Sequence, residues 1–388
     1  MWEPIDAGWS VRELSEIELG DRRLERRARR VAEELSQKPE APINQASEDW
    51  AATKGAYRLF DNEKVSAEKI LSPHRERTLE RIRGESVVLV VQDTTYLNYS
   101  AHEFVAGLGP IGDSRSDAQG LIMHSALAVT PEGLPLGLLA QQIRARAGTY
   151  GAKETRKKKP IEAKESYRWV EALQETQKLT TQKTQVVTIC DRESDIYEFF
   201  VEAEKLKANF IVRASWDRSL QNEAYSNLWA MVQAQDCSGH TTVEIPNRSV
   251  TEVRRLELEV RFTSVTLRAP QRYVRKGIER LPAVTLQAVY LKEITPAPGS
   301  DPVEWLLLTN LPVQTLEEAL EKAAWYTRRW SIGASSEGRI IQSVRDRPRL
   351  KDSSLAAREA LRRESKTTEP SDNALCRRAR DTPGCNVQ

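Results

Sequence analysis

Two short apolar runs, each leading to an aspartate, constrain the fold of this chain most strongly. Residues 87–91 (VVLVV) precede Asp93, and residues 186–190 (VVTIC) precede Asp191. A continuous, β-rich apolar run of this length is typical of a strand that is covered on both faces. The pattern predicts an α/β layer fold with a mixed sheet, in which both strands end at an acidic residue.

The other predicted elements alternate as such a fold requires. Pro131, Glu132 and Gly133 form a hairpin signal between two of them. In chain order we expect strands at 121–129 and 134–143, a helix around 167–173, a helix from 195 to about 205, a strand at 210–212, alternating strands within 216–300, a strand at 305–308 and a helix that Thr315 caps.

Residues up to about 84 predict a small helical module with a strongly positive face. Asp21 can cap a helix whose apolar stripe is Leu24, Ala28, Val31 and Leu35. Arginines cover much of the remaining surface of that helix: Arg22, Arg23, Arg26, Arg27, Arg29 and Arg30. We expect a second helix from a Ser47 cap that presents Lys54, Tyr57 and Arg58 within one turn, and a third from Ser66 to a stop at Gly84. This surface suits the DNA backbone, although a solvated face or an acidic partner protein would also explain it.

Composition excludes several other classes of protein. The formal charge of +2 is nearly balanced, and no apolar run approaches the ~18–20 residues of a bilayer span. The amino terminus lacks the pattern of a secretory signal, so we expect a cytoplasmic protein without a membrane partner. The four cysteines form no C-x-x-C pair, which argues against a zinc site and a disulfide framework. Metal chemistry would therefore depend on carboxylates.

Asp93 and Asp191 could provide those carboxylates. Ligands collect beside strand ends in α/β sheets, so the two side chains would face each other if their strands are neighbours. Carboxylates suit Mg²⁺, and Mn²⁺ takes the same ligands. A metal site of this kind supports phosphodiester cleavage or transfer. The alternative is that each aspartate is a turn or helix-cap residue.

Four stretches of the chain carry a family resemblance. They span about residues 9–332 and read ELGDRRLERRARRVAEELSQKPEAPINQASEDWAATKGAYRLFDNEKV, VVQDTTYLNYSAH, TICDRESDIYEFF and EWLLLTNLPVQTLEEALEKAAWYTRRWSI. In this order they resemble segments of bacterial cut-and-paste DDE transposases of the insertion-sequence-four-like group. The resemblance implies a ribonuclease-H-like core with a β-rich insertion. It also implies cleavage at the inverted repeats of the chain's own transposable element, followed by strand transfer to target DNA.

The resemblance assigns roles to individual residues. Asp93 and Asp191 would be the catalytic, metal-binding carboxylates. Tyr326 and Arg329 would contact DNA near the cleavage site. Trp305 falls where the family has a tryptophan associated with a flipped base, although a buried core position is the other interpretation.

The sequence departs from the family pattern after Ile332. The family has Glu seven residues beyond the tyrosine and Lys seven residues further, where this chain has Gly333 and Ile340. Glu337 lies one helical turn beyond Gly333, so its carboxylate would be displaced by ~6 Å along the helix axis. This displacement is large compared with a metal–oxygen contact of ~2 Å, so Glu337 is a poor replacement for the family's Glu. Residues 333–388 contain no Phe, Tyr or Trp, a composition that favours disorder. We hypothesise a shifted reading frame there, with a divergent tail as the alternative, and sequencing of the encoding DNA distinguishes the two.

These observations predict the following segments: a helical DNA-binding domain (1–84), the first part of a catalytic core (85–215), a β-rich insertion (216–300), the last strand and helix of the core (301–332) and a divergent tail (333–388). The predicted function is a Mg²⁺-dependent transposase that binds double-stranded DNA. The alternatives are a transposase-derived DNA-binding protein that does not cut, and a nuclease that never transfers strands. The family pairs subunits on DNA through a carboxyl-terminal part, which a frameshift would replace here.

Overall fold

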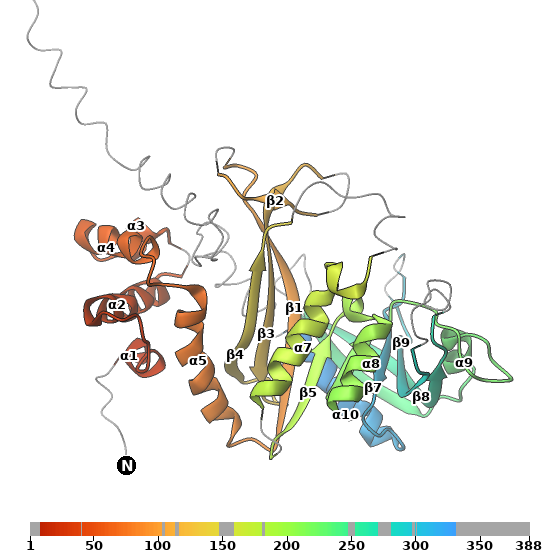
Figure 1. Ribbon diagram of the computed structural model, residues 1–388. Helices are drawn as coiled ribbons and strands as arrows, with labels where there is room; N and C mark the ends of the chain where they lie inside the picture. The colour runs from red at the N-terminus through yellow and green to blue at the C-terminus, as the bar shows by residue number, and fades with distance from the viewer. Residues whose placement is uncertain are drawn as a thin grey trace, which may run out of the picture.

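The computed structural model shows a group of helices at the amino-terminal end, followed by a mixed sheet with helices on both faces (Figure 1). The residues it describes are 8–39, 41–102, 105–112, 116–146, 159–180, 183–246, 253–270, 281–296, 299 and 301–330. The expectations for Gly333, Glu337, Ile340 and the whole tail 333–388 lie outside this range. Within the described part, no helix combines the length and apolar character needed to cross a bilayer.

The helices that precede the sheet bury one apolar side and expose the other. They are α1 (Trp9–Glu13), α2 (Arg22–Gln37), α3 (Ile43–Ala46), α4 (Trp50–Phe60) and α5 (Ala67–Ile82). The stripe predicted for α2 is buried, because Leu24, Ala28, Val31 and Leu35 all pack into the core of this helical part. The predicted caps at Asp21 and Ser66 are confirmed, since their side chains accept hydrogen bonds from the N–H groups of Arg23 and Lys69.

The predicted Ser47 cap is wrong. Asp49 caps α4, because its carboxylate accepts a hydrogen bond of 2.7 Å from the N–H of Ala52. Ser47 instead follows the short helix α3, and its hydroxyl donates to the carbonyl oxygen of Ile43 at 2.7 Å. The short helix α3 has no clear pattern in the sequence, so the start of α4 was expected at the first residue able to cap.

The sheet has the mixed character that the sequence predicts. Its strands are β1 (Val87–Asn98), β2 (Gly109–Pro110), β3 (Gln119–Val129), β4 (Pro135–Arg144), β5 (Gln185–Cys190), β6 (Asn209–Arg213), β7 (Gly239–Pro246), β8 (Val253–Leu267), β9 (Val284–Glu293) and β10 (Glu304–Thr309). Their order is β2-β3-β1-β5-β6-β10-β9-β8-β7, with β4 paired to β3. The pairs β1/β5 and β5/β6 are parallel, whereas the other pairs are antiparallel.

The first strand is longer than predicted. β1 continues past Asp93 to Asn98 because its second half pairs with β3, with Asp93 opposite Ser125. The parallel pairing with β5 ends earlier, at Val91 opposite Ile189. The polar residues from Gln92 onwards, which suggested that the strand ends, thus pair with β3 but not with β5.

Helices cover the two faces of the sheet through alternating strand residues. On one face, α7 (Tyr167–Leu179), α8 (Tyr197–Leu206) and α9 (Leu228–Gln233) contribute to a core that contains Leu306 and Leu308 of β10. On the other face, α10 (Leu316–Thr327) packs with Trp305 and Leu307 of the same strand. Short 3₁₀ turns lie at Ile161–Ala163 (η1) and Arg192–Ser194 (η2). The mixed α/β class is confirmed, while the ribonuclease-H-like assignment and the domain boundaries stay predictions.

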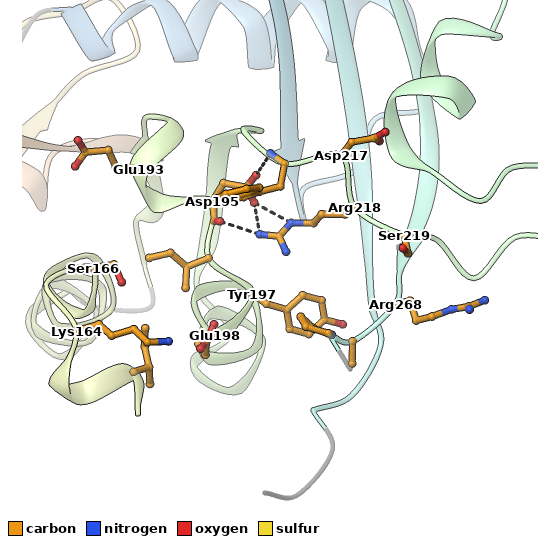
Figure 2. A pocket seen from close by; sticks show the side chains of 15 residues that line it. Lys164, Ser166, Glu193, Asp195, Tyr197, Glu198, Asp217, Arg218, Ser219 and Arg268 are labelled. Atoms are coloured by element: carbon orange, nitrogen blue, oxygen red, sulfur yellow. Dashed lines mark hydrogen bonds and ion pairs between the residues drawn. The ribbon is translucent and has the colours of Figure 1, made fainter. Parts of the chain in front are cut away.

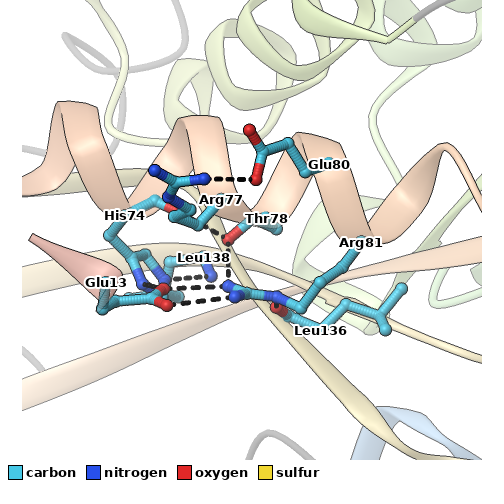
Figure 3. A network of polar contacts seen from close by, with 8 residues as sticks. All are labelled: Glu13, His74, Arg77, Thr78, Glu80, Arg81, Leu136 and Leu138. Carbon is cyan, nitrogen blue, oxygen red and sulfur yellow. Dashed lines mark hydrogen bonds and ion pairs between the residues drawn. The ribbon is translucent and has the colours of Figure 1, made fainter. Parts of the chain in front are cut away.

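A polar network joins the helical part to the sheet (Figure 3). His74 of α5 accepts a hydrogen bond at Nε2 from the N–H of Leu138 in β4, at 2.8 Å. Its Nδ1 therefore carries the proton and donates to Glu13 of α1 at 2.6 Å. Burial lowers the pKa of His74, which favours this neutral form. Arg81 donates to Glu13 and to the carbonyl oxygen of Leu136. The network fixes α1 and α5 against β4.

The start of α10 depends on a capping box. The Thr315 hydroxyl accepts from the N–H of Glu318, and the Glu318 carboxylate accepts from the N–H of Thr315. We expect Thr315→Ala to lower the free energy of unfolding by about 1 kcal/mol, because it removes this cap. Thr315→Ser keeps the hydroxyl and should unfold like the unmodified chain. Urea denaturation of the three proteins measures the difference, and equal stability of all three would contradict the role of the cap.

Candidate active site and nucleic-acid interface

Asp93 and Asp191 lie at matching positions on adjacent parallel strands. The last paired residues of β1 and β5 are Val91 and Ile189, and each aspartate follows two residues later. Both side chains are partly buried. Burial raises the pKa of Asp93 to about 6, the positive charge of Arg329 opposes this rise, and the charge of Asp191 adds to it. The sequence-predicted pair is therefore brought together where the pairing of β1 with β5 ends.

Asp191 also has the turn function that was its alternative interpretation. It follows the end of β5 and caps η2, where its Oδ1 accepts from the N–H of Glu193 at 2.8 Å. The hydroxyl of Ser194 donates to its carbonyl oxygen at 2.7 Å. Asp93, by contrast, lies within β1, so it ends no strand and caps no helix. One aspartate of the pair thus has a local structural role and the other does not.

Basic and aromatic side chains at the end of α10 and just beyond it lie near the carboxylate pair, and Arg213 of β6 lies next to them. Arg329 lies just beyond the end of α10, with its guanidinium 5.9 Å from the ring centre of Tyr326 and 5.3 Å from that of Trp330. Its Nε is buried and has no hydrogen-bond partner among the described residues. The partly buried Arg213 of β6 interacts with Tyr326, and burial lowers the pKa of Arg213. These groups give the site positive charge beside two carboxylates, which suits a phosphate.

Tyr326 and Trp305 are core residues in this structure. Tyr326 is 1% exposed and Trp305 is 2% exposed, and their ring centres lie 5.8 Å apart. Trp330 packs against both rings. The Trp305 and Tyr326 rings belong to the same hydrophobic core. The contact of Trp305 with a flipped base stays a prediction, and it would require the ring to become exposed.

The carboxylate pair fits Mg²⁺ by its chemistry. Mg²⁺ binds through one or two carboxylates and keeps water and phosphate oxygens in its remaining positions. Burial is the main cause of the raised pKa of Asp93 and the charge of Asp191 adds to it, so the ionised form of Asp93 is disfavoured in this environment. Burial raises the pKa of the neighbouring Cys190 thiol, which keeps it protonated and unsuited to bind metal. Among the described residues, no cluster of three or more His, Cys, Asp or Glu could hold a metal ion.

Four arginines of α2 line a groove beside α4. The groove has a volume of about 420 Å³, and Arg23, Arg26, Arg27 and Arg30 all line it. Ala51, Ala52 and Gly55 form its α4 side, and the side chain of Arg27 packs against Gly55. Arg30 makes ion pairs of 2.8 and 2.7 Å with Glu34 and Glu48. The predicted basic surface is thus hollowed rather than flat.

Other residues of this surface differ in their environments. Arg22, Lys54 and Arg58 are exposed, whereas Tyr57 is half-buried against the helical core. Lys54 lies 5.6 Å from the ring centre of Trp50, a 52% exposed side chain that no sequence pattern had indicated. Arg29 points elsewhere, because it donates to the carbonyl oxygens of Leu14 and Ser15 at 2.9 and 3.0 Å. Arg29 therefore holds α1 in place and does not belong to the exposed basic surface.

A second hollow of about 610 Å³ lies next to η2, and no sequence pattern predicted it (Figure 2). The buried carboxylate of Asp195 lines this hollow, and it is held in place because it accepts hydrogen bonds from the N–H groups of Ser215 and Trp216 at 2.7 and 2.9 Å. Arg218 pairs with the same carboxylate. Lys164 and Arg268 contribute positive charge to the lining, and Glu193 and Glu198 contribute negative charge.

Comparison with known families connects the helical part to DNA. Residues 6–65 match a family model described as transposase DNA-binding. The match covers the arginines of α2 and the exposed residues of α4, and it ends before α5. It supports a transposase, and it supports DNA as the partner of this chain.

The raised pKa of Asp93 predicts a pH-dependent effect on stability. Between the ordinary value of 3.8 and about 6, the folded chain keeps a proton that the unfolded chain has released. The contribution of Asp93 to stability therefore falls as the pH rises through this window. In EDTA near neutral pH, we expect Asp93→Asn to melt a few degrees above the unmodified chain. This advantage should largely disappear near pH 3.8.

Calorimetry across this pH range measures the effect. Asp236→Asn, which changes an exposed aspartate outside the site, serves as the control and should match the unmodified chain. A melting temperature of Asp93→Asn equal to or below that of the unmodified chain at neutral pH would contradict the prediction.

The arginine groove predicts a measurable change in the salt dependence of DNA binding. We expect Arg26→Ala combined with Arg30→Ala to weaken binding to duplex DNA. The slope of log affinity against log salt should fall by roughly 0.9 for each phosphate that the variant no longer neutralises. Fluorescence anisotropy over a salt series gives the slope. The control is Arg83→Ala combined with Lys178→Ala, which removes the same charge from exposed positions at the ends of α5 and α7. An unchanged slope in the α2 variant would show that this groove does not bind phosphate.

Proposed function

We propose that the chain is a metal-dependent DDE transposase with a ribonuclease-H-like core, similar to the insertion-sequence-four-like group. It would bind the inverted repeats of its own element, cut at their ends and transfer the freed strand to target DNA. The observation that carries this proposal is the placement of Asp93 and Asp191 at matching positions on parallel strands β1 and β5. The transposase DNA-binding match over residues 6–65 supports it independently.

The residues divide the work between two surfaces. The arginines that line the α2 groove would hold the DNA backbone through phosphate contacts. Asp93 and Asp191 would hold Mg²⁺ or Mn²⁺, which supplies a Lewis acid for phosphodiester chemistry when bound. Arg329 and Arg213 would orient the phosphate beside the carboxylates and stabilise its negative charge. The buried Tyr326 would keep Arg213 and Arg329 in place through its hydroxyl and its ring.

A DNA-binding protein without cleavage activity is the second candidate. It is favoured by the number of carboxylates, because the described residues supply two at the site and no cluster of three. Gly333 stands where the family has its third acidic residue. Such a protein would keep the helical part and occupy transposon ends without cutting them.

A cleavage assay separates the two candidates. The purified chain is incubated with Mg²⁺ or Mn²⁺ and a duplex that contains the inverted repeats flanking its coding sequence. For the transposase we expect nicks at the repeat ends, lost in Asp93→Ala and Asp191→Ala and retained in Asp236→Ala. Binding without nicks in the unmodified chain would overturn the enzymatic proposal and support the binding protein.

A further inference from the structure

Backbone N–H groups of two residues orient the carboxylate pair. The N–H of Thr94 lies beside the Asp93 carboxylate and favours its ionised form, and the N–H of Glu193 donates to Asp191 Oδ1 at 2.8 Å. Thr94 belongs to β1 and Glu193 to η2. The direction of each carboxylate therefore depends on where these two backbone segments lie.

One buried arginine connects the two segments. Arg168 of α7 is 8% exposed, and its Nε donates to the hydroxyl oxygen of Thr94 at 3.0 Å. Its Nη2 donates to Glu193 Oε2 at 2.7 Å, and its Nη1 donates to the carbonyl oxygen of Glu165 at 3.0 Å. The guanidinium is planar and rigid, so contacts at both sides of it fix the separation of the groups they reach. A lysine ammonium at this position could not reproduce that geometry.

The Thr94 hydroxyl is itself held in one orientation. His124 of β3 lies opposite Thr94, and its Nε2 is 3.3 Å from Gln92 Oε1, which can only accept. Nε2 therefore carries the proton, and Nδ1 accepts from the Thr94 hydroxyl at 2.9 Å. The lone pairs of that hydroxyl then remain available for Arg168. The His124 ring packs edge-on against Trp169, the residue next to Arg168, with 4.6 Å between ring centres.

This connection matters because the strands themselves stop short of the site. The β1/β5 ladder ends at Val91 and Ile189, before either aspartate. Beyond that point, Arg168 connects the two segments, because it hydrogen-bonds to Thr94, next to Asp93, and to Glu193, two residues after Asp191. We propose that Arg168 is a positioning residue that sets the separation of Asp93 and Asp191. This inference rests on the proposed function, since it concerns the same metal-binding pair.

Mn²⁺ affinity of the full chain, measured by electron paramagnetic resonance well below the melting temperature, tests the proposal. We expect Arg168→Lys and Thr94→Val to weaken Mn²⁺ binding about tenfold, as is usual when a residue that orients a metal ligand is removed. Thr94→Ser keeps the hydroxyl and should bind like the unmodified chain. The control Arg144→Lys alters another arginine that pairs with a glutamate of α7, at 2.6 Å from Glu171, and should also leave the affinity unchanged.

The outcomes distinguish this proposal from the proposed function. Asp93→Asn and Asp191→Asn show whether Mn²⁺ occupies the pair. If the unmodified chain binds no Mn²⁺, or these variants bind it equally well, the metal-dependent function fails and the role of Arg168 fails with it. If they lose binding while Arg168→Lys and Thr94→Val bind normally, the role of Arg168 alone is overturned. Two other results would also overturn the role of Arg168 alone. One is a lower melting temperature of Arg168→Lys or Thr94→Val with unchanged Mn²⁺ affinity, and the other is a Thr94→Ser variant that binds Mn²⁺ as weakly as Thr94→Val.

Discussion

The hydrogen-bonded ladder between β1 and β5 brings together residues that are far apart in the sequence. It runs in parallel from Val87 opposite Gln185 to Val91 opposite Ile189, and it leaves Asp93 and Asp191 side by side. A shift of the register by one residue would turn one of the two carboxylates to the other face of the sheet. The apolar residues of both strands prevent such a shift, since Leu89, Val91, Val187 and Ile189 must all reach the same core.

The placement of the carboxylates is unfavourable by itself, and the surrounding structure compensates for it. Burial and the charge of Asp191 both favour the protonated form of Asp93, while Arg329 favours the ionised form. Arg329 reaches the site because α10 packs on the sheet through Ala319, Ala323 and Tyr326. A cation at the pair would reduce the same repulsion. Stability and the proposed chemistry therefore oppose each other at the carboxylate pair, as is usual for functional sites.

Apart from the Ser47 cap, the features that depend on local interactions were predicted well. The α2 stripe, the caps at Asp21, Ser66 and Thr315 and the apolar run of β5 all follow from residues a few positions apart. The continuation of β1 beyond Asp93 was missed because it depends on pairing with β3. The role of Arg29 depends on where α1 lies, which a helical stripe does not reveal.

The candidate site shows the same division. Asp93 and Asp191 could be selected from the sequence because each follows an apolar run, whereas Tyr326 and Arg329 were assigned only through a family resemblance. Arg168 carried no signal in the sequence, since its contacts join Thr94, Glu165 and Glu193, which lie on separate segments. The third carboxylate of the family pattern has no counterpart among the described residues, and its expected position, Gly333, lies outside them.

The anchoring of α5 has a consequence for how DNA would be presented to the sheet. His74 and Arg81 bind α5 to β4, and Glu13 adds α1 to the same joint. A flexible linker would allow the helical part to take many positions relative to the sheet. The hydrogen bonds to β4 instead hold the helical part in one position. For DNA bound to both parts, the number of base pairs between the sequence held by the helices and the phosphate beside Asp93 and Asp191 would then be restricted by this joint.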